Sequence, residues 1–264
     1  MSQDLLIVYA MEVRIAVVQQ NVLQDLEQTL EMIRSSVAGI PEPDLVLLPE
    51  LFATGYEFPD IKTGLKRSQR ALDFMRELSR ETGALIGGTL ITEEDSRFYN
   101  TFLMVVDREI LHRQHKTHLF KPMREDQLFS PGNSIKAFES PIGTIGVFIC
   151  YELRFPEIAR KLVSQGAELL LVPAEWPRPR QEVWKLLCRA RAAENQVFLA
   201  SANRWGPGGE SFYGGNSGVY DPNGTALVQI TDGAGAAWAD IELEQLREIR
   251  SSIPVWQDRR EELY

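Results

Sequence analysis

The sequence contains little cysteine and little histidine. Its 264 residues include 2 Cys and 3 His. The two cysteines, Cys150 and Cys188, are too few for a disulfide framework, so we expect a reducing, cytoplasmic environment. The histidines, His112, His115 and His118, form no zinc-binding spacing with the cysteines. We therefore expect no metal site.

Long apolar runs and an excess of basic residues are also absent. No segment is long and apolar enough to predict a membrane-spanning helix, and the first ten residues lack the basic region of a secretory signal peptide. Lys and Arg total 28 against 37 Asp and Glu, which gives a net charge of -9. This balance argues against a nucleic-acid or anionic-membrane partner and favours a small-molecule substrate.

The composition is that of an ordinary globular protein, with 44% hydrophobic and 25% charged residues. No linker or charge run divides the chain, so we expect one domain at residues 11–264. Residues 1–10 are expected to be a loosely held extension. Met11 directly precedes the first predicted strand and is an alternative start.

Apolar strands and amphipathic helices alternate through the first third of the chain, and a hairpin follows. Strands are predicted at residues 13–19, 44–49, 84–90, 101–106 and 109–116. Glycines end the first two predicted helices, at Gly39 and Gly83. A Gly-rich loop is predicted at residues 206–215, followed by two strands that a turn at residues 221–224 separates. The number of strands and the interleaved helices predict an α/β fold with two sheets packed face to face and helices outside.

One cysteine lies where a strand gives way to a helix. Residues 144–149 predict a buried strand, Pro156 suits the first turn of a helix, and Gly166 suits its end. Another apolar strand follows at residues 169–172. Because ligands of such units collect at the carboxyl ends of the strands, Cys150 is a candidate nucleophile. The alternative is that Cys150 is a small buried hydrophobe.

Glu50 and Lys116 also follow apolar strands, and their chemistry complements a thiol. A nucleophilic cysteine requires a base or a nearby cation, because a free thiol is mostly protonated near neutrality. Glu50 can be the base, and its apolar neighbours, such as Leu51 and Phe52, predict that desolvation raises its pKa. Lys116 and a backbone N–H after Cys150 can stabilise an oxyanion. Taken singly, Glu50 could instead cap a turn and Lys116 could be a solvated hairpin end.

Three motifs, in order, resemble the carbon–nitrogen hydrolase (nitrilase) family. They are LLPE with ATGY at residues 47–56, HKTHLF at 115–120 and ICYELRFP at 149–156. The resemblance continues at residues 173–177, 184–196, 203–204, 215–222 and 253–260. It implies a four-layer α-β-β-α sandwich, a Glu50–Lys116–Cys150 triad and no cofactor. It also implies a second glutamate that holds the lysine and the substrate amide. Glu125 matches this position, with Asp126 as the alternative.

Within the family, the chain is similar to the ω-amidase-like branch, which hydrolyses monoamides of 2-oxo dicarboxylic acids. The candidate substrate-binding residues are Tyr56, Tyr151, Arg154, Glu175 and Trp176. Arg154 is expected to pair with a substrate carboxylate, the alternative being an ion pair with Glu152 or Glu157. Glu175 replaces an asparagine that is usual in the branch, and it is expected to add negative charge unless Arg154 or Arg178 compensates.

Other functions and an oligomer are also considered. A nitrilase or an N-carbamoyl amino acid amidohydrolase would use the same triad, and a catalytically silent binding or scaffold protein would keep only the fold. The resemblance predicts a homodimer or a larger homo-oligomer. The tail at residues 252–264 supports this, because its apolar side chains need a surface to cover. The tail could equally dock on its own subunit.

Overall fold

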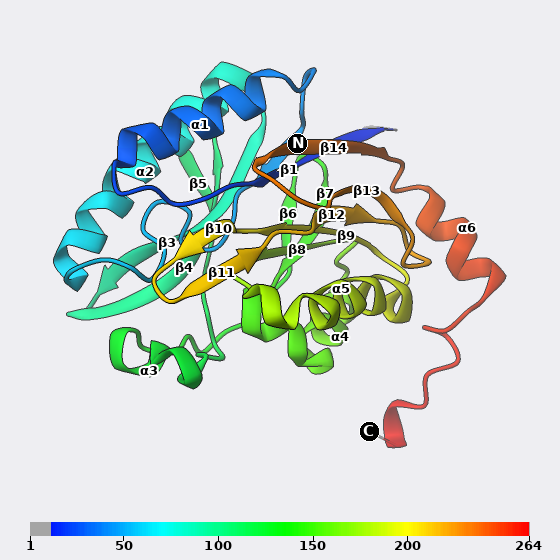
Figure 1. The fold of residues 1–264 in the computed structure, drawn as a ribbon. Helices are drawn as coiled ribbons and strands as arrows, with labels where there is room; N and C mark the ends of the chain where they lie inside the picture. Colours follow the sequence, from blue (N-terminus) through cyan, green and yellow to red (C-terminus); the bar gives the residue numbers. More distant parts are fainter. Residues whose placement is uncertain (1–11, 264) are drawn as a thin grey trace, which may run out of the picture.

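Two six-stranded sheets form the centre of the part of the protein that the computed structural model describes, residues 12–263 (Figure 1). The expected extension at residues 1–10 therefore lies outside the described residues. The first sheet has the order β14 (Gly235–Ile241), β1 (Val13–Gln19), β2 (Leu45–Leu47), β3 (Leu85–Glu94), β4 (Arg97–Val106) and β5 (Glu109–His115). The second has the order β13 (Ala226–Ile230), β12 (Ser217–Tyr220), β9 (Phe198–Asn203), β8 (Leu169–Ala174), β7 (Gly143–Val147) and β6 (Phe138–Ser140).

The strands at the centre of each sheet are parallel. In the first sheet, β2 pairs in parallel with β1 and β3, and in the second, β8 pairs in parallel with β7 and β9. Antiparallel strands complete both sheets. Parallel strands are usually covered on both faces, so nearly all of their residues are apolar. The strands predicted from the sequence showed this continuous apolar pattern.

The first sheet is buried on both faces by different partners. Ile15 and Val17 of β1 belong to a core that includes Val219 and Leu199 of the second sheet. The intervening residues Ala16 and Val18 belong instead to the core formed with the helices α1 (Leu26–Ala38) and α2 (Ile61–Thr82). Successive side chains of a strand point to opposite faces of the sheet. A single apolar strand therefore packs against the second sheet on one face and against the helices on the other.

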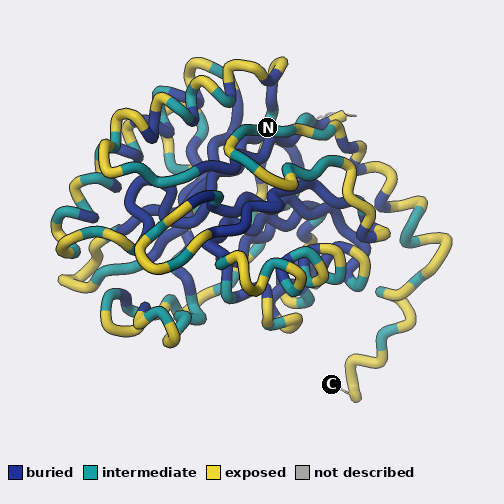
Figure 2. Tube along the Cα trace, in the orientation of Figure 1, coloured by how far each residue is buried: buried dark blue, intermediate teal, exposed yellow. Residues whose placement is uncertain are grey.

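Helices cover the outer faces of the two sheets. The helices α1 and α2 lie over the first sheet, and α4 (Pro156–Ser164) and α5 (Gln181–Asn195) lie over the second (Figure 1). Their outward faces are exposed, whereas the strands between them are buried (Figure 2). The α-β-β-α sandwich expected from the sequence is therefore confirmed. None of the helices within residues 12–263 combines the length and the hydropathy that a bilayer crossing requires.

The predicted Gly-rich loop is in fact a hairpin, so that prediction was wrong. Strands β10 (Trp205–Gly208) and β11 (Ser211–Gly214) pair antiparallel, with Pro207 opposite Phe212. The turn between them contains Gly209 in the left-handed region, at φ 54°. Glycines carry no side chain, so they hid the alternation that identifies a strand.

Several elements were not predicted, among them β14 and α6 (Gln245–Ser252). The side chains of β14 are small or partly exposed, and the strand is held by antiparallel pairing with β1, from Val13 with Ile241 to Gln19 with Gly235. A pairing partner so distant in the sequence leaves no local signal.

Candidate active site

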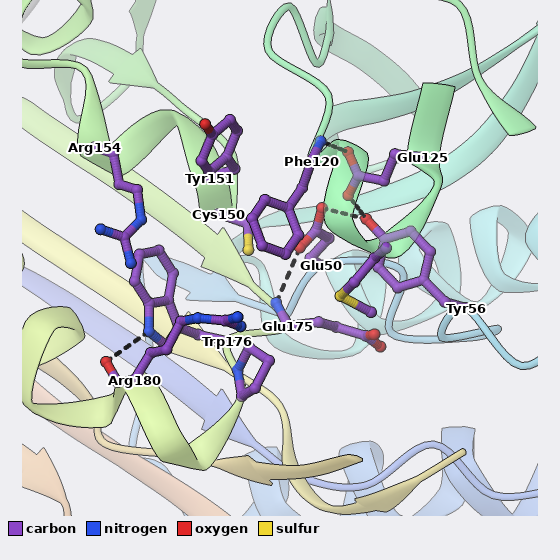
Figure 3. Close-up of a pocket in the computed structure, with 12 residues that line it drawn as sticks. Glu50, Tyr56, Phe120, Glu125, Cys150, Tyr151, Arg154, Glu175, Trp176 and Arg180 are labelled. Carbon is purple, nitrogen blue, oxygen red and sulfur yellow. Dashed lines mark hydrogen bonds between the residues drawn. The ribbon is translucent and has the colours of Figure 1, made fainter. Parts of the chain in front are cut away.

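All of the predicted catalytic and substrate-binding residues line one cavity except Lys116, which hydrogen-bonds to Glu50 of that lining (Figure 3). The lining residues are Glu50, Tyr56, Phe120, Met123, Glu125, Cys150, Tyr151, Arg154, Glu175, Trp176, Pro177 and Arg180. Glu50 follows β2, Lys116 follows β5 and Cys150 follows β7, so the ends of three strands supply the centre of the site.

Cys150 lies in a sharp turn at the head of the short 3-10 helix η2 (Cys150–Arg154). Its φ is 47°, in the left-handed region that non-glycine residues rarely occupy. Such a conformation costs about 1–3 kcal/mol and persists where the surroundings enforce it. The side chain is 8% exposed, so the sulfur sits at the floor of the cavity and within reach of a small molecule.

Glu50 is fully buried and accepts several hydrogen bonds. Its Oε1 accepts from Lys116 Nζ at 2.7 Å, the Tyr56 hydroxyl at 2.9 Å and Asn100 Nδ2 at 2.8 Å. Its Oε2 accepts the backbone N–H of Glu175 at 3.0 Å. The interaction between the Cys150 thiol and this carboxylate also acts to lower the pKa of Glu50. The carboxylate is thus fixed in position beside the sulfur.

The expectation that the pKa of Glu50 is raised was wrong. Burial does act to raise it, but the Lys116 ammonium and the hydrogen bonds to the carboxylate outweigh burial, and the pKa is lowered. The apolar residues next to Glu50 in the sequence do not decide its charge. The cation that decides it comes from the end of another strand, 66 residues away.

Lys116 lies between two carboxylates. Its Nζ donates to Glu50 Oε1 at 2.7 Å and to Glu125 Oε1 at 2.6 Å, and its side chain is 0% exposed. Burial alone would lower the pKa of Lys116, but the two carboxylates raise it, so the side chain is a cation. Glu125 also accepts the Phe120 N–H at 2.8 Å and a hydrogen bond from the Tyr56 hydroxyl. Asp126 is exposed, so the structure favours Glu125 over this alternative.

The thiol of Cys150 is uncharged in the resting site. Burial raises its pKa well above the usual value, and the charge of Glu50 adds to this, while Lys116 acts in the opposite direction. Cys188 is also buried with a raised pKa, but its surroundings are Ser201, Arg191 and the core rather than a carboxylate base. The structure therefore places Cys188 in the packing of α5, as predicted.

Glu152 ties the nucleophile turn to the segment that carries Lys116. Its Oε2 accepts the N–H of Ile149 at 2.7 Å, and its Oε1 accepts the N–H of Thr117 at 2.6 Å. These N–H groups belong to the residues directly before Cys150 and directly after Lys116. The carboxylate is fully buried, so it sets the spacing between the two functional side chains.

Arg154 is not paired with Glu152, whose oxygens are taken by the N–H groups just described. Its guanidinium lies over the Trp176 ring, 4.8 Å from the centroid. Within residues 12–263 Arg154 forms no ion pair with a carboxylate, Glu157 included. Trp176 is 4% exposed and fixed by its Nε1, which donates to the Arg180 carbonyl at 2.8 Å. Arg154 is therefore held by an aromatic face, with its N–H groups available to a ligand.

The expected effect of Glu175 needs correction, because its partner is Arg204. Arg204 Nη1 donates to Glu175 Oε1 at 3.1 Å and to Glu57 Oε2 at 2.8 Å. Burial raises the pKa of Glu175 to about 8, although Arg204 acts against the shift. At neutral pH Glu175 is thus mostly uncharged. Neither Arg154 nor Arg178 is needed to compensate it.

Comparison with known proteins identifies the family. The model of the carbon–nitrogen hydrolase family matches residues 14–251. The chain is a carbon–nitrogen hydrolase. It is 36% identical over 225 residues to a 2-oxoglutaramate amidase of Bacillus subtilis, covering 84% of this chain and 86% of that protein. It is 34% identical over 226 residues to an omega-amidase of Escherichia coli K12, covering 84% and 87%.

Solved structures agree with this assignment. The carbon–nitrogen hydrolase of Helicobacter pylori G27 has the same fold, with a TM-score of 0.90, 22% identity and coverage of 96% of this chain and 97% of that chain. The amidase from Nesterenkonia sp. AN1, solved in complex with acrylamide, has a TM-score of 0.84 and 27% identity, covering 96% of both chains. This carbon–nitrogen hydrolase is therefore an amidase-type enzyme of the nitrilase superfamily.

Sequence reasoning missed several residues of this hydrolase site. Phe120, Met123, Pro177 and Arg180 line the cavity, Asn100 binds Glu50, and Arg204 hydrogen-bonds to Glu175. Arg180 had a signal, since it follows the PAEWP motif by three residues, and Arg204 lies in the matched residues 203–204. Asn100 had no such signal and reaches Glu50 through the pairing of the strands. Within residues 12–263 the structure contains no group of three or more His, Cys, Asp or Glu side chains that could hold a metal.

Proposed function

We propose that this hydrolase cleaves the terminal amide of a 2-oxo dicarboxylic acid monoamide, such as 2-oxoglutaramate, to a carboxylate and ammonia. The observation that carries the proposal is the meeting of Cys150, Glu50, Lys116 and Glu125 at one small cavity. The substrate class is supported by the two relatives named for 2-oxoglutaramate and ω-amides, which the chain matches over most of their length.

The first half of the proposed reaction transfers the acyl group to the enzyme. Glu50 takes the proton of the Cys150 thiol as the sulfur attacks the amide carbon. The Lys116 ammonium and the N–H of Tyr151 stabilise the oxyanion that forms. When this intermediate collapses, the C–N bond breaks, Glu50 returns the proton to the nitrogen, and ammonia leaves a thioester on Cys150.

The second half regenerates the thiol. Glu50 removes a proton from a water molecule as the water oxygen attacks the thioester carbon. The C–S bond then breaks, the proton passes from Glu50 to the sulfur, and the carboxylic acid product loses its remaining proton to solvent or to the released ammonia and leaves as a carboxylate. Glu125 and Tyr56 keep Lys116 and Glu50 in place through both halves.

The resting charges explain why the thiol is activated only when substrate is present. Glu50 has a lowered pKa and Cys150 a raised one, so proton transfer between them is unfavourable in the empty site. During attack the negative charge moves onward to the substrate oxygen, where Lys116 and Tyr151 N–H receive it. The transfer is therefore coupled to bond formation rather than preceding it. Both cysteines are free, as is usual in a reducing compartment, so we propose a cytoplasmic location.

A substrate panel tests the proposed function. The kcat/KM for ammonia release should be at least about 100-fold higher with 2-oxoglutaramate than with a nitrile or an N-carbamoyl amino acid of similar size. This ratio corresponds to a difference of about 2.7 kcal/mol in transition-state binding. Rapid quenching and intact-mass measurement should detect the acyl adduct on Cys150. Preference for the nitrile or the carbamoyl compound would contradict the substrate but not the triad. Absence of turnover with every compound would favour a silent scaffold.

We also propose that the enzyme is a homodimer or larger. The tail docks in part on its own subunit, because Trp256 Nε1 donates to the Asn195 carbonyl at 2.9 Å. Beyond this contact the chain extends away from the body (Figure 1). Ile253, just before the contact, and Leu263, after it, are 63% and 64% exposed. Apolar side chains at such exposure are suited to covering a second subunit.

Sedimentation velocity at micromolar concentration should give a dimer or a larger species. The double variant Ile253→Asp with Leu263→Asp should weaken association by about 10-fold or more, since charged groups replace apolar contacts. Leu227→Asp is the matched control, an exposed apolar residue of β13 that is 45% exposed and should leave association unchanged. A monomeric wild-type protein would contradict the proposal.

A further inference from the structure

Two arginines line the cavity at the end away from Lys116. Arg154 comes from the turn after Cys150, and Arg180 from the short 3-10 helix η3 (Arg178–Arg180). In Figure 3 their side chains lie on either side of the Trp176 indole, and the Arg180 guanidinium points into the cavity. We propose that Arg180, acting with Arg154, binds the carboxylate of the substrate and so determines the preference for acidic amides. This inference rests on the proposed function and deepens it.

The distribution of charge orients an acidic amide in one direction. At the Cys150 end, Glu50 and Glu125 share one cation, Lys116, so this end carries a net negative charge. At the other end are the guanidinium groups of Arg154 and Arg180. A substrate carboxylate is repelled from the first end and attracted to the second. The neutral amide is then the group that faces the sulfur.

The two guanidinium groups are positioned by aromatic rings rather than by carboxylates. Arg154 lies over Trp176, and Arg180 lies over Phe120 at 5.6 Å from the ring centroid. Within residues 12–263 neither is recorded in an ion pair. A guanidinium held over a ring face does not use its N–H groups for that contact, and those N–H groups match the two oxygens of a carboxylate.

The backbone under Arg180 is held firmly. The Arg180 carbonyl accepts the Trp176 Nε1 hydrogen bond at 2.8 Å, and its N–H donates to the Pro177 carbonyl at 3.0 Å. Trp176 thus supports both arginines, one through its ring face and one through its N–H. Both hydrogen bonds use the Arg180 main chain, so replacing its side chain leaves them intact. A substitution of Arg180 therefore tests the guanidinium without disturbing the backbone.

The test compares two substrates and three single variants. The substrates are 2-oxoglutaramate and pentanamide, a neutral amide of the same chain length. Arg180→Gln and Arg154→Gln should each reduce kcat/KM for the acidic amide by roughly 10- to 100-fold, the value of a hydrogen bond to a charged group, chiefly through KM. Their activity on pentanamide should change by less than about 3-fold, which also shows that the variants fold.

Arg178→Gln is the matched control. Arg178 belongs to the same η3 turn, but it stacks on Phe212 at 5.3 Å and lies outside the cavity that contains Cys150. It should keep both activities and the ratio between them. Equal losses on both substrates in Arg180→Gln, or an unchanged preference for the acidic amide, would overturn the role of Arg180. If the wild-type enzyme itself shows no preference for the acidic amide, the proposed substrate fails instead, and this is seen before any variant is measured.

Discussion

Replacing Cys150 by alanine is expected to abolish ammonia release while leaving the fold intact. The substitution removes the sulfur that forms the thioester, and the described residues that line the cavity include no other thiol. We expect kcat to fall by at least about 10⁴-fold, as for other enzymes that lose their nucleophile. The volume change is small, so the free energy of unfolding should change by about 1 kcal/mol.

Cys188→Ala is the control for this prediction. Both cysteines are free and buried, but Cys188 is 0% exposed and has no carboxylate base beside it. The Cys188 variant should keep its activity, and iodoacetamide should inactivate it as it inactivates the wild type. Inactivation by alkylation of Cys188, or turnover by the Cys150 variant at a wild-type rate, would show that the nucleophile is misassigned.

Replacing Lys116 by methionine is expected to damage both activity and stability. The change removes an oxyanion donor, which costs about 10²- to 10³-fold in kcat. It also leaves the Glu50 and Glu125 carboxylates buried without their cation, since the ion pairs are at 2.7 and 2.6 Å and the Lys116 side chain is 0% exposed. Breaking a buried ion pair on one side costs about 3–5 kcal/mol. Chemical denaturation and ammonia release measure the two effects.

Two further variants separate these effects. Adding Glu125→Gln to Lys116→Met removes one uncompensated charge, so it should recover part of the lost stability without recovering turnover. Lys185→Met breaks the exposed pair with Glu182, whose side chain is 87% exposed, and should cost no more than about 1 kcal/mol with full activity. Unchanged stability in Lys116→Met would contradict the assigned charge state, and unchanged kcat would contradict the role of Lys116.

Much of the local structure followed from the sequence. The strand before Cys150 and the helix after it were predicted from local signals. These are the spacing of the apolar residues, a proline at the start of the helix and a glycine at its end, all within a short stretch of sequence. The helices α1 and α2 ended near Gly39 and at Gly83 for the same reason. Glu50, Lys116, Glu125 and Cys150 were selected by the family motifs around them, and the structure brings these four side chains together.

The errors concern interactions between distant segments. The pKa of Glu50 was misjudged because its neighbours in the chain are apolar, whereas Lys116 lies 66 residues away. Glu175 was assigned the wrong compensating arginines because Arg204, 29 residues away, approaches it only when β8 and β9 pair. The pairing of β14 with β1 joins segments that lie far apart in the sequence and has no local signature.

The sequence by itself determined the family, the alternation of strands and helices, and the identity of the residues available for thiol chemistry. These properties depend on side-chain type and on short-range periodicity, which a linear chain displays directly. Only the tertiary structure decided which carboxylate is charged, which arginine faces the cavity and how the nucleophile turn is tied to Lys116 through Glu152. Those properties depend on distances of a few ångströms between segments far apart in sequence, because Coulomb energies and hydrogen bonds fall off over that range.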